Sequence, residues 1–199
     1  DAIVSYQKAL EINPNYPALH NNLGNAYKQQ GQLHDALDSY SKGLTYNPDY
    51  IDLLNNIGVI FNDLGRFDEA VKSYERAISI KPDYAEAYNN LGVTYNKLGQ
   101  LEEAVRSYEK ALNIRLKEFG GDHISVASAY NSLGSYYSDI GDYDKSVSFF
   151  KKYTRTSGVN TRSFEYLKAK NELKNYDKVQ LLLQDTVDVE IKNLGFEIN

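Results

Sequence analysis

The sequence contains no cysteine, no methionine and no tryptophan, and only four of its 199 residues are proline. Without cysteine the chain can form no disulfide, no thiolate metal site and no cysteine nucleophile. Its apolar runs are much shorter than the roughly 20 residues that span a bilayer, which argues against a membrane protein. Because the initiator methionine is missing, we expect the sequence to be a fragment or a processed chain.

The sequence also has no excess of positively charged residues. The chain has 22 lysines and arginines against 27 aspartates and glutamates, which gives a net charge of −5. This mild acidity argues against nucleic acid as the main partner, because nucleic-acid-binding surfaces are basic. No secretory signal is visible, but the sequence starts inside a repeat and so does not test for one. The location we expect is cytoplasmic.

What the sequence does have is a pattern that repeats every 34 residues. Five kinds of position recur together at this step. They are Gly24, Gly58 and Gly92; Gly31, Gly65 and Gly99; Ala36, Ala70 and Ala104; Tyr40, Tyr74 and Tyr108; and Pro14, Pro48 and Pro82. A fixed period at which several independent positions recur is the signature of a repeat architecture.

One period, residues 85–114, shows what each repeat builds. Apolar residues recur at steps of three and four on both sides of Gly99, which predicts two amphipathic helices. Gly99 can adopt the left-handed conformation that ends the first helix and lets the chain reverse. Small residues at Gly92 and Ala104 let the two helices approach closely, and Tyr108 fills the remaining space. The hairpin has more apolar surface than it can hide alone, so it requires neighbouring copies.

Proline marks the junction between successive repeats. Pro14, Pro48 and Pro82 are each followed by Asn or Asp and then by Tyr, and proline cannot continue a helix. We expect the Asn or Asp after each proline to accept hydrogen bonds from free amides at the start of the next helix. The predicted helices run near residues 17–30, 33–46, 51–64 and 67–80.

The Leu-Gly…Tyr…Ala…Tyr…Ala…Pro pattern resembles the tetratricopeptide repeat family. The resemblance covers the chain from Asp1 to about Thr156 and continues more weakly to the end. It implies an all-α fold, a right-handed superhelical solenoid of antiparallel helix pairs, and a groove that binds peptides or proteins. We therefore predict one solenoid domain made of a partial repeat (1–16), four repeats (17–50, 51–84, 85–126 and 127–159), a degenerate C-terminal capping hairpin (160–194) and a tail (195–199).

The two ends of this array differ from its middle. Residues 1–16 match only the second helix of a repeat, so we expect more repeats to precede them; the alternative is a natural start that leaves an apolar flank uncovered. That uncovered flank could allow weak self-association. At the other end we expect helices near 162–174 and 176–194, the second with an apolar stripe. The stripe consists of Val179, Leu182, Leu183, Val187, Ile191 and Leu194.

The third repeat is longer than the others. Its second helix continues beyond Ile114 and ends at Gly120-Gly121, and the pattern returns 42 residues after its previous position. This spacing resembles the extended repeats of kinesin light chains and related arrays. Two interpretations remain open: a longer helix that changes the pitch locally, or a contact of Leu116 and Phe119 with a partner or a neighbouring domain.

The sequence contains no recognisable catalytic site. His20, His34 and His123 have no partners at the spacing of a metal site or a catalytic triad. The acidic pairs at 68–69 and 102–103 recur once per repeat, which a single active site would not require, and acidic residues favour the first turn of a helix. We therefore expect a protein that is not an enzyme and that carries no cofactor and no metal.

Asparagine is the polar residue that recurs on the predicted first helices. Pairs of asparagine precede the Leu-Gly or Ile-Gly step in three repeats, and stacking would align them into a ladder. The amide of asparagine both donates and accepts, so it can pair with a peptide main chain whatever its sequence. The peptide-binding arm of O-GlcNAc transferases is similar in this respect. The candidate peptide-binding residues are Asn21, Asn22, Asn25, Lys28, Asn55, Asn56, Asn62, Asn89, Asn90, Asn96, Lys97 and Asn131.

The asparagine ladder has two interpretations, a ligand site or part of the scaffold, and the sequence favours neither. The resulting hypothesis is a non-catalytic interaction scaffold that binds a protein or peptide segment in its concave groove. The alternatives are a substrate-presenting arm of a larger enzyme, such as a glycosyltransferase, and a self-associating module. Repeat folds serve many functions, so the fold alone does not choose among them.

Overall fold

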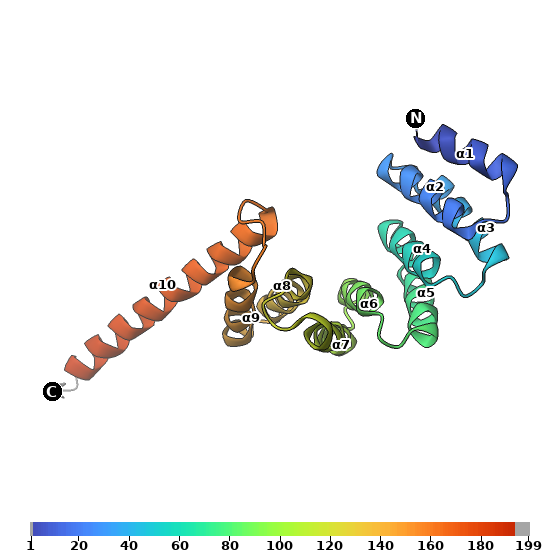
Figure 1. Ribbon diagram of the computed structural model, residues 1–199. Helices are drawn as coiled ribbons and strands as arrows, with labels where there is room; N and C mark the ends of the chain where they lie inside the picture. Colours follow the sequence, from blue (N-terminus) through green and yellow to red (C-terminus); the bar gives the residue numbers. More distant parts are fainter. Residues whose placement is uncertain (1, 194–199) are drawn as a thin grey trace. The chain divides into compact units, whose positions relative to one another are not determined.

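The computed structural model describes residues 2–193, and all regular secondary structure within them is α-helical (Figure 1). The helices are α1 (Ala2–Ile12), α2 (Pro17–Gln29), α3 (Leu33–Tyr46), α4 (Ile51–Asp63), α5 (Phe67–Ile80), α6 (Ala85–Lys97), α7 (Leu101–Phe119), α8 (Ile124–Asp139), α9 (Tyr143–Arg155) and α10 (Phe164–Asn193). The prediction of an all-α solenoid of helical hairpins is confirmed. No helix in this range is long and apolar enough to cross a membrane.

The helices form two compact units, Asp1–Ile114 and Arg115–Asn199, which we describe separately. In the first unit α2 packs against α3 and α4 against α5, so each repeat is a hairpin. The first helices of successive repeats also touch, α2 with α4 and α4 with α6. These three helices therefore form one continuous layer, which we call the α2–α4–α6 face.

Glycine makes the reversal within each hairpin, as the sequence predicts. Gly31, Gly65 and Gly99 have φ of 75°, 74° and 74°, values that are costly for residues with a Cβ. After α4, Gly65 N–H donates to the Asn62 carbonyl at 3.1 Å and Arg66 N–H to the Phe61 carbonyl at 2.8 Å. These bonds satisfy carbonyl groups that the end of a helix otherwise leaves unpaired.

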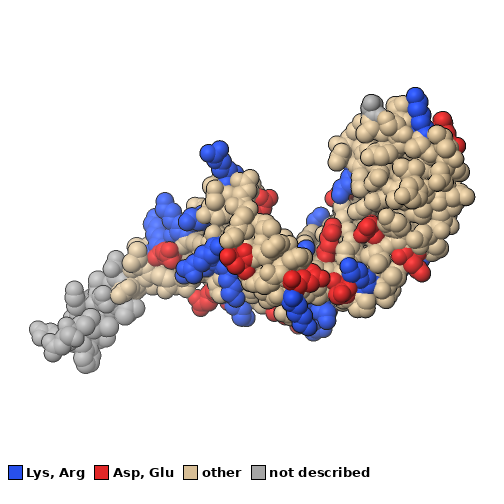
Figure 2. Space-filling model, in the orientation of Figure 1, with Lys and Arg blue, Asp and Glu red and all other residues tan. Residues whose placement is uncertain are grey.

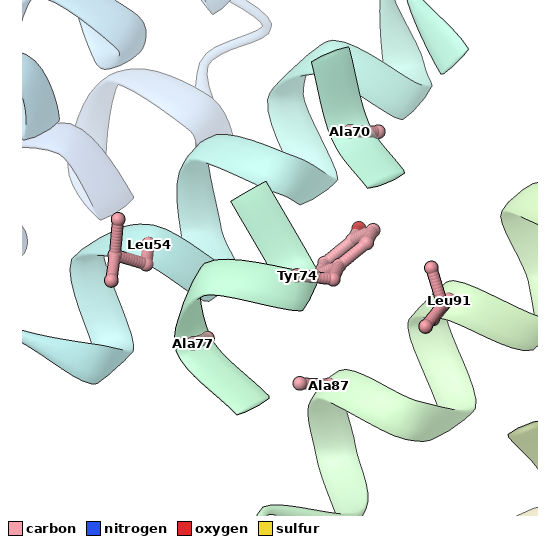
Figure 3. Packing of buried hydrophobic residues seen from close by; sticks show 6 residues of the cluster. All are labelled: Leu54, Ala70, Tyr74, Ala77, Ala87 and Leu91. Carbon is pink, nitrogen blue, oxygen red and sulfur yellow. The ribbon is translucent and has the colours of Figure 1, made fainter. Parts of the chain in front are cut away.

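The core is shared between neighbouring repeats. One cluster joins α4, α5 and α6 (Figure 3) and consists of Leu54, Ala70, Tyr74, Ala77, Ala87 and Leu91. The Tyr74 ring lies directly on Gly58, where an added Cβ would come within 2.5 Å of the ring. Helical glycine is thus required here for close approach rather than for a turn, and the hairpin hides its apolar surface only with help from the next repeat.

The prediction that the Asn or Asp after each proline caps the next helix is wrong. Tyr16, Tyr50 and Tyr84 occupy the N-cap positions, and none of them forms a side-chain capping bond. Because α4 begins at Ile51, Asp49 lies one position before the N-cap, too early to reach the first free amides of the helix. The side chain that acts in this turn is Asn47, whose Oδ1 accepts from the Asp49 amide at 3.2 Å.

The second helix of the third repeat is longer than its counterparts, as the sequence predicts. Helix α7 has 19 residues, against 14 in α3 and α5, and it ends before Gly120, which has φ of 78°. Phe119 stacks on His123, with ring centroids 4.7 Å apart. His123 in turn caps α8, because its Nδ1 accepts from the Ser125 amide at 3.1 Å. Phe119 therefore has a partner within its own connection.

The predicted C-terminal hairpin over residues 160–194 is not formed. Helix α10 is one helix from Phe164 to Asn193, because no glycine or proline in that stretch ends it. It packs on α9, where the Tyr176 hydroxyl donates to Asp144, and its Ala169 side chain is fully buried. Val179 in the predicted stripe is 51% exposed. The side chains of Val187, Ile191 and Leu194 in this stripe, together with the predicted tail 195–199, lie outside the described residues.

Candidate functional site

Two asparagine pairs connect the helices of the α2–α4–α6 face. Asn56 Nδ2 donates to Asn21 Oδ1 at 2.9 Å, which links α4 to α2. Asn90 Nδ2 donates to Asn55 Oδ1 at 3.1 Å, which links α6 to α4. The same pairing recurs between successive repeats, so the predicted alignment of asparagines into a ladder is present in the first unit.

The first pair leaves one amide nitrogen and one amide oxygen unused. Each asparagine amide has two N–H groups and an oxygen with two lone pairs. Within the described residues, Nδ2 of Asn21 and Oδ1 of Asn56 make no hydrogen bond. Both side chains are half-buried. The bond between them fixes both amides, so the free donor and acceptor are held in place before any ligand arrives.

The second pair is more deeply built into the scaffold. Asn55 is only 2% exposed, and its Nδ2 also donates to Glu86 Oε1 at 3.3 Å. Its oxygen and its nitrogen are therefore both engaged. We assign Asn55 to the scaffold, and of this pair only Asn90 keeps an oxygen that no described group occupies.

Asn25 accepts hydrogen bonds from within the protein and so belongs to the scaffold. Its Oδ1 accepts from the Tyr40 hydroxyl at 2.7 Å and lies 3.5 Å from Asn56 Nδ2. Burial raises the pKa of Tyr40 to about 12, because the charged phenolate is disfavoured away from water. In the next repeat Val59 replaces Asn25, and the buried hydroxyl of Tyr74 has no partner among the described residues.

The remaining predicted residues differ in exposure. Asn22 and Lys97 are exposed, whereas Lys28, Asn62, Asn89, Asn90 and Asn96 are half-buried on α2, α4 and α6. Lys97 Nζ lies 5.6 Å from the centre of the Phe67 ring. Asn62 Oδ1 is buried without a described partner. Asn131 is half-buried on α8 in the second unit.

Two carboxylates on the same face were not among the predicted site residues. Asp52 and Glu86 lie in the first turns of α4 and α6, and the Tyr84 hydroxyl donates to Asp52 Oδ1 at 3.2 Å. Burial is the main cause that raises the pKa of Tyr84, and the negative charges of Glu86 and Asp52 raise it further. The 34-residue step between Asp52 and Glu86 is a signal by which the sequence could have indicated them.

The histidines and acidic residues form no metal site in the described range, where no three potential ligands come together. His20 is a packing residue, as predicted: it is 6% exposed, its Nε2 lies 2.8 Å from the Pro14 carbonyl oxygen, and its ring stacks on Tyr46. That the chain is not an enzyme stays a prediction.

Comparison with known proteins relates this geometry to a family. The family model described as TPR repeat matches residues 1–31, 24–65 and 58–99, and the model described as Tetratricopeptide repeat matches residues 83–157. A search of curated proteins gives no match.

Similar folds occur among solved structures. One crystal structure of MamA is 26% identical over 88% of this chain and 89% of MamA, with a TM-score of 0.63. A second MamA structure is 29% identical over 78% and 80% of the two chains, with a TM-score of 0.63. BtubC (BKLC) from P. vanneervenii, 18% identical over 100% and 90% of the chains with a TM-score of 0.71, shares the fold. With family matches from residue 1 to residue 157, the chain belongs to the tetratricopeptide repeat family, whose arrays are scaffolds for protein–protein interaction.

Proposed function

We propose that the α2–α4–α6 face is a concave groove that binds an extended segment of a protein partner through its main chain. The observation that carries this proposal is the Asn21–Asn56 pair. It leaves Nδ2 of Asn21 free to donate and Oδ1 of Asn56 free to accept. The 2.9 Å bond between the other two amide atoms holds both side chains in place. A peptide group needs one acceptor for its N–H and one donor for its carbonyl, so the pair is complementary to one residue of an extended chain.

The pair is suited to binding because it is already ordered. Fixing a free side chain on binding costs roughly 0.5–1.5 kcal/mol, and an amide held by its neighbour avoids most of this cost. Asn90 on α6 offers a further acceptor one repeat away. Contacts of this kind read the main chain and leave side-chain specificity to neighbouring groups, which suits an interaction scaffold without catalytic activity.

A peptide selected on the protein from a random library tests the proposal. We expect the double variant Asn21→Ala, Asn56→Ala to bind the peptide about tenfold more weakly, because each of two hydrogen bonds contributes about 1 kcal/mol or less. Removing both members of the pair leaves neither of them unsatisfied. Methylating the main-chain nitrogens of the peptide should weaken binding to the wild type in the same way.

The matched control is Asn13→Ala, Asn113→Ala, which removes two exposed asparagines elsewhere in the first unit. Its affinity should equal that of the wild type by fluorescence anisotropy. Equal affinity of the Asn21, Asn56 variant would contradict the proposal. If that variant instead loses its helical circular dichroism or its thermal transition, the pair is scaffold.

A further inference from the structure

The charge of the second unit is concentrated in one segment. Residues 145–178 contain nine lysines and arginines but only three acidic residues, a net charge of +6 in a chain whose total is −5. Figure 2 shows basic side chains gathered along α10. The segment covers most of α9 and the first half of α10, two helices that pack against each other.

A groove lies between these two helices. Its volume is about 580 Å³, and its lining includes Lys151 from α9 with Leu167, Lys170, Leu173, Lys174 and Asp177 from α10. The lining therefore includes one lysine from α9 and two from α10, together with the carboxylate of Asp177. Leucine supplies an apolar surface between the charges: Leu167 is 57% exposed and Leu173 is half-buried.

The groove lysines are not neutralised within the described residues. Lys151, Lys170 and Lys174 form no ion pair there, whereas Lys145 of the same segment pairs with Asp142 at 2.8 Å. Lys152, next to Lys151, is also engaged, since its Nζ lies 5.3 Å from the centre of the Phe149 ring. The three lysines that line the groove therefore keep their positive charge available for a ligand.

We propose that the groove between α9 and α10 binds an acidic segment of a protein partner that carries an apolar side chain between its carboxylates. The three ammonium groups would pair with the carboxylates, and the apolar side chain would cover Leu167 and Leu173. An open groove with lysines from both helices suits an extended chain. A nucleic-acid backbone presents negative charge but no apolar side chain to cover the two leucines. This site is separate in sequence from the asparagine pairs and does not depend on their function.

The test uses a short peptide with blocked ends in which glutamates flank a central leucine, labelled with fluorescein and titrated with the whole chain. We expect saturable binding that weakens as salt is added. The variant Lys151→Gln, Lys170→Gln, Lys174→Gln should bind roughly tenfold more weakly, because each exposed charge pair contributes little and three are lost. Leu167→Ala should weaken binding of this peptide but not of one with serine in place of leucine.

The control variant is Lys8→Gln, Lys72→Gln, Lys110→Gln, which removes the same charge from exposed positions of the first unit. It should bind the peptide as the wild type does. Equal weakening by both triple variants would overturn the proposal, because net charge rather than the groove would then control affinity. Tighter binding of a DNA duplex or of phosphatidylserine vesicles, with the same dependence on the groove lysines, would also overturn it.

Discussion

Tyr40 and Tyr74 occupy the same position in successive repeats, yet their hydroxyl groups have different surroundings. Both side chains are fully buried. Tyr40 donates to Asn25 at 2.7 Å, whereas Val59 stands in the corresponding place opposite Tyr74 and leaves its hydroxyl without a described partner. A buried polar group without a hydrogen bond destabilises the fold, and a bonded one contributes modestly.

The same substitution should therefore have different effects at the two positions. We expect Tyr40→Phe to lower the free energy of unfolding by about 1 kcal/mol, and Tyr74→Phe to leave it unchanged or to raise it by up to about 1 kcal/mol. Phenylalanine is tolerated in this position, since Phe150 occupies it in the fourth repeat and is fully buried. Urea unfolding followed by circular dichroism measures both values, and equal losses would contradict the interpretation.

The buried tyrosines also predict a loss of stability at high pH. In the folded chain burial raises the pKa of Tyr40 from 10.0 to about 12, so the neutral form is favoured there. An unfolded tyrosine ionises above pH 10, which stabilises the unfolded state. The contribution is complete below pH 10 and is lost as the pH rises to about 12. The melting temperature should fall over this range, and it should fall less in Tyr40→Phe; identical pH profiles would show that Tyr40 is not responsible.

Among the elements, the hairpins depend on a glycine in the first helix that faces an aromatic ring in the second. A Cβ at Gly24, Gly58, Gly92 or Gly134 would lie 2.3–2.7 Å from a ring carbon of the facing tyrosine or phenylalanine. Such distances force the ring or the helices to move. The recurring glycine is therefore a packing requirement that sets how closely the two helices of a hairpin approach.

Substitution of one of these glycines tests this requirement. We expect Gly58→Ala to lower the free energy of unfolding by roughly 1–3 kcal/mol, the usual cost of overpacking, despite the better helix propensity of alanine. Gly121→Ala is the control, because the nearest atom to its Cβ would be 3.8 Å away. Denaturant unfolding of both variants gives the comparison, and a Gly58→Ala variant as stable as the wild type would show that the helices can move apart.

At the scale of the whole molecule, the first helix of the first unit, α1, is packed on one side only and remains largely exposed. No residue of α1 is buried, and Ile12 and Val4 are 88% and 45% exposed. Repeat arrays cover such end helices with a further repeat, a cap or another chain.

We therefore predict weak self-association through α1. The mass measured by light scattering should rise above 22.6 kDa as the concentration increases. The double variant Val4→Ser, Ile12→Ser should suppress the rise, while Val179→Ser on α10 should not. A mass that stays at the monomer value throughout the concentration series would exclude this contact.

The sequence determined the repeating part of this protein by itself. The 34-residue step, the apolar periodicity and the glycine reversals define where α2 to α5 begin and end, because each signal is local and recurs in register with the others. The asparagine positions of the candidate face followed from the same register. The failed predictions concern geometry over a few residues: Asp49 lies one position too early to cap α4, and α10 has nothing to stop it.

Only the tertiary structure decided which asparagines keep a free donor or acceptor. Asn21, Asn55, Asn56 and Asn90 look equivalent in the sequence, but contacts between helices about 34 residues apart bury Asn55 and leave the first pair half-buried with a free donor and acceptor. Burial and hydrogen-bond partners depend on which helices pack together, and no local pattern encodes them. The α9–α10 groove likewise exists only because α10 packs on α9 and brings Lys170 and Lys174 beside Lys151.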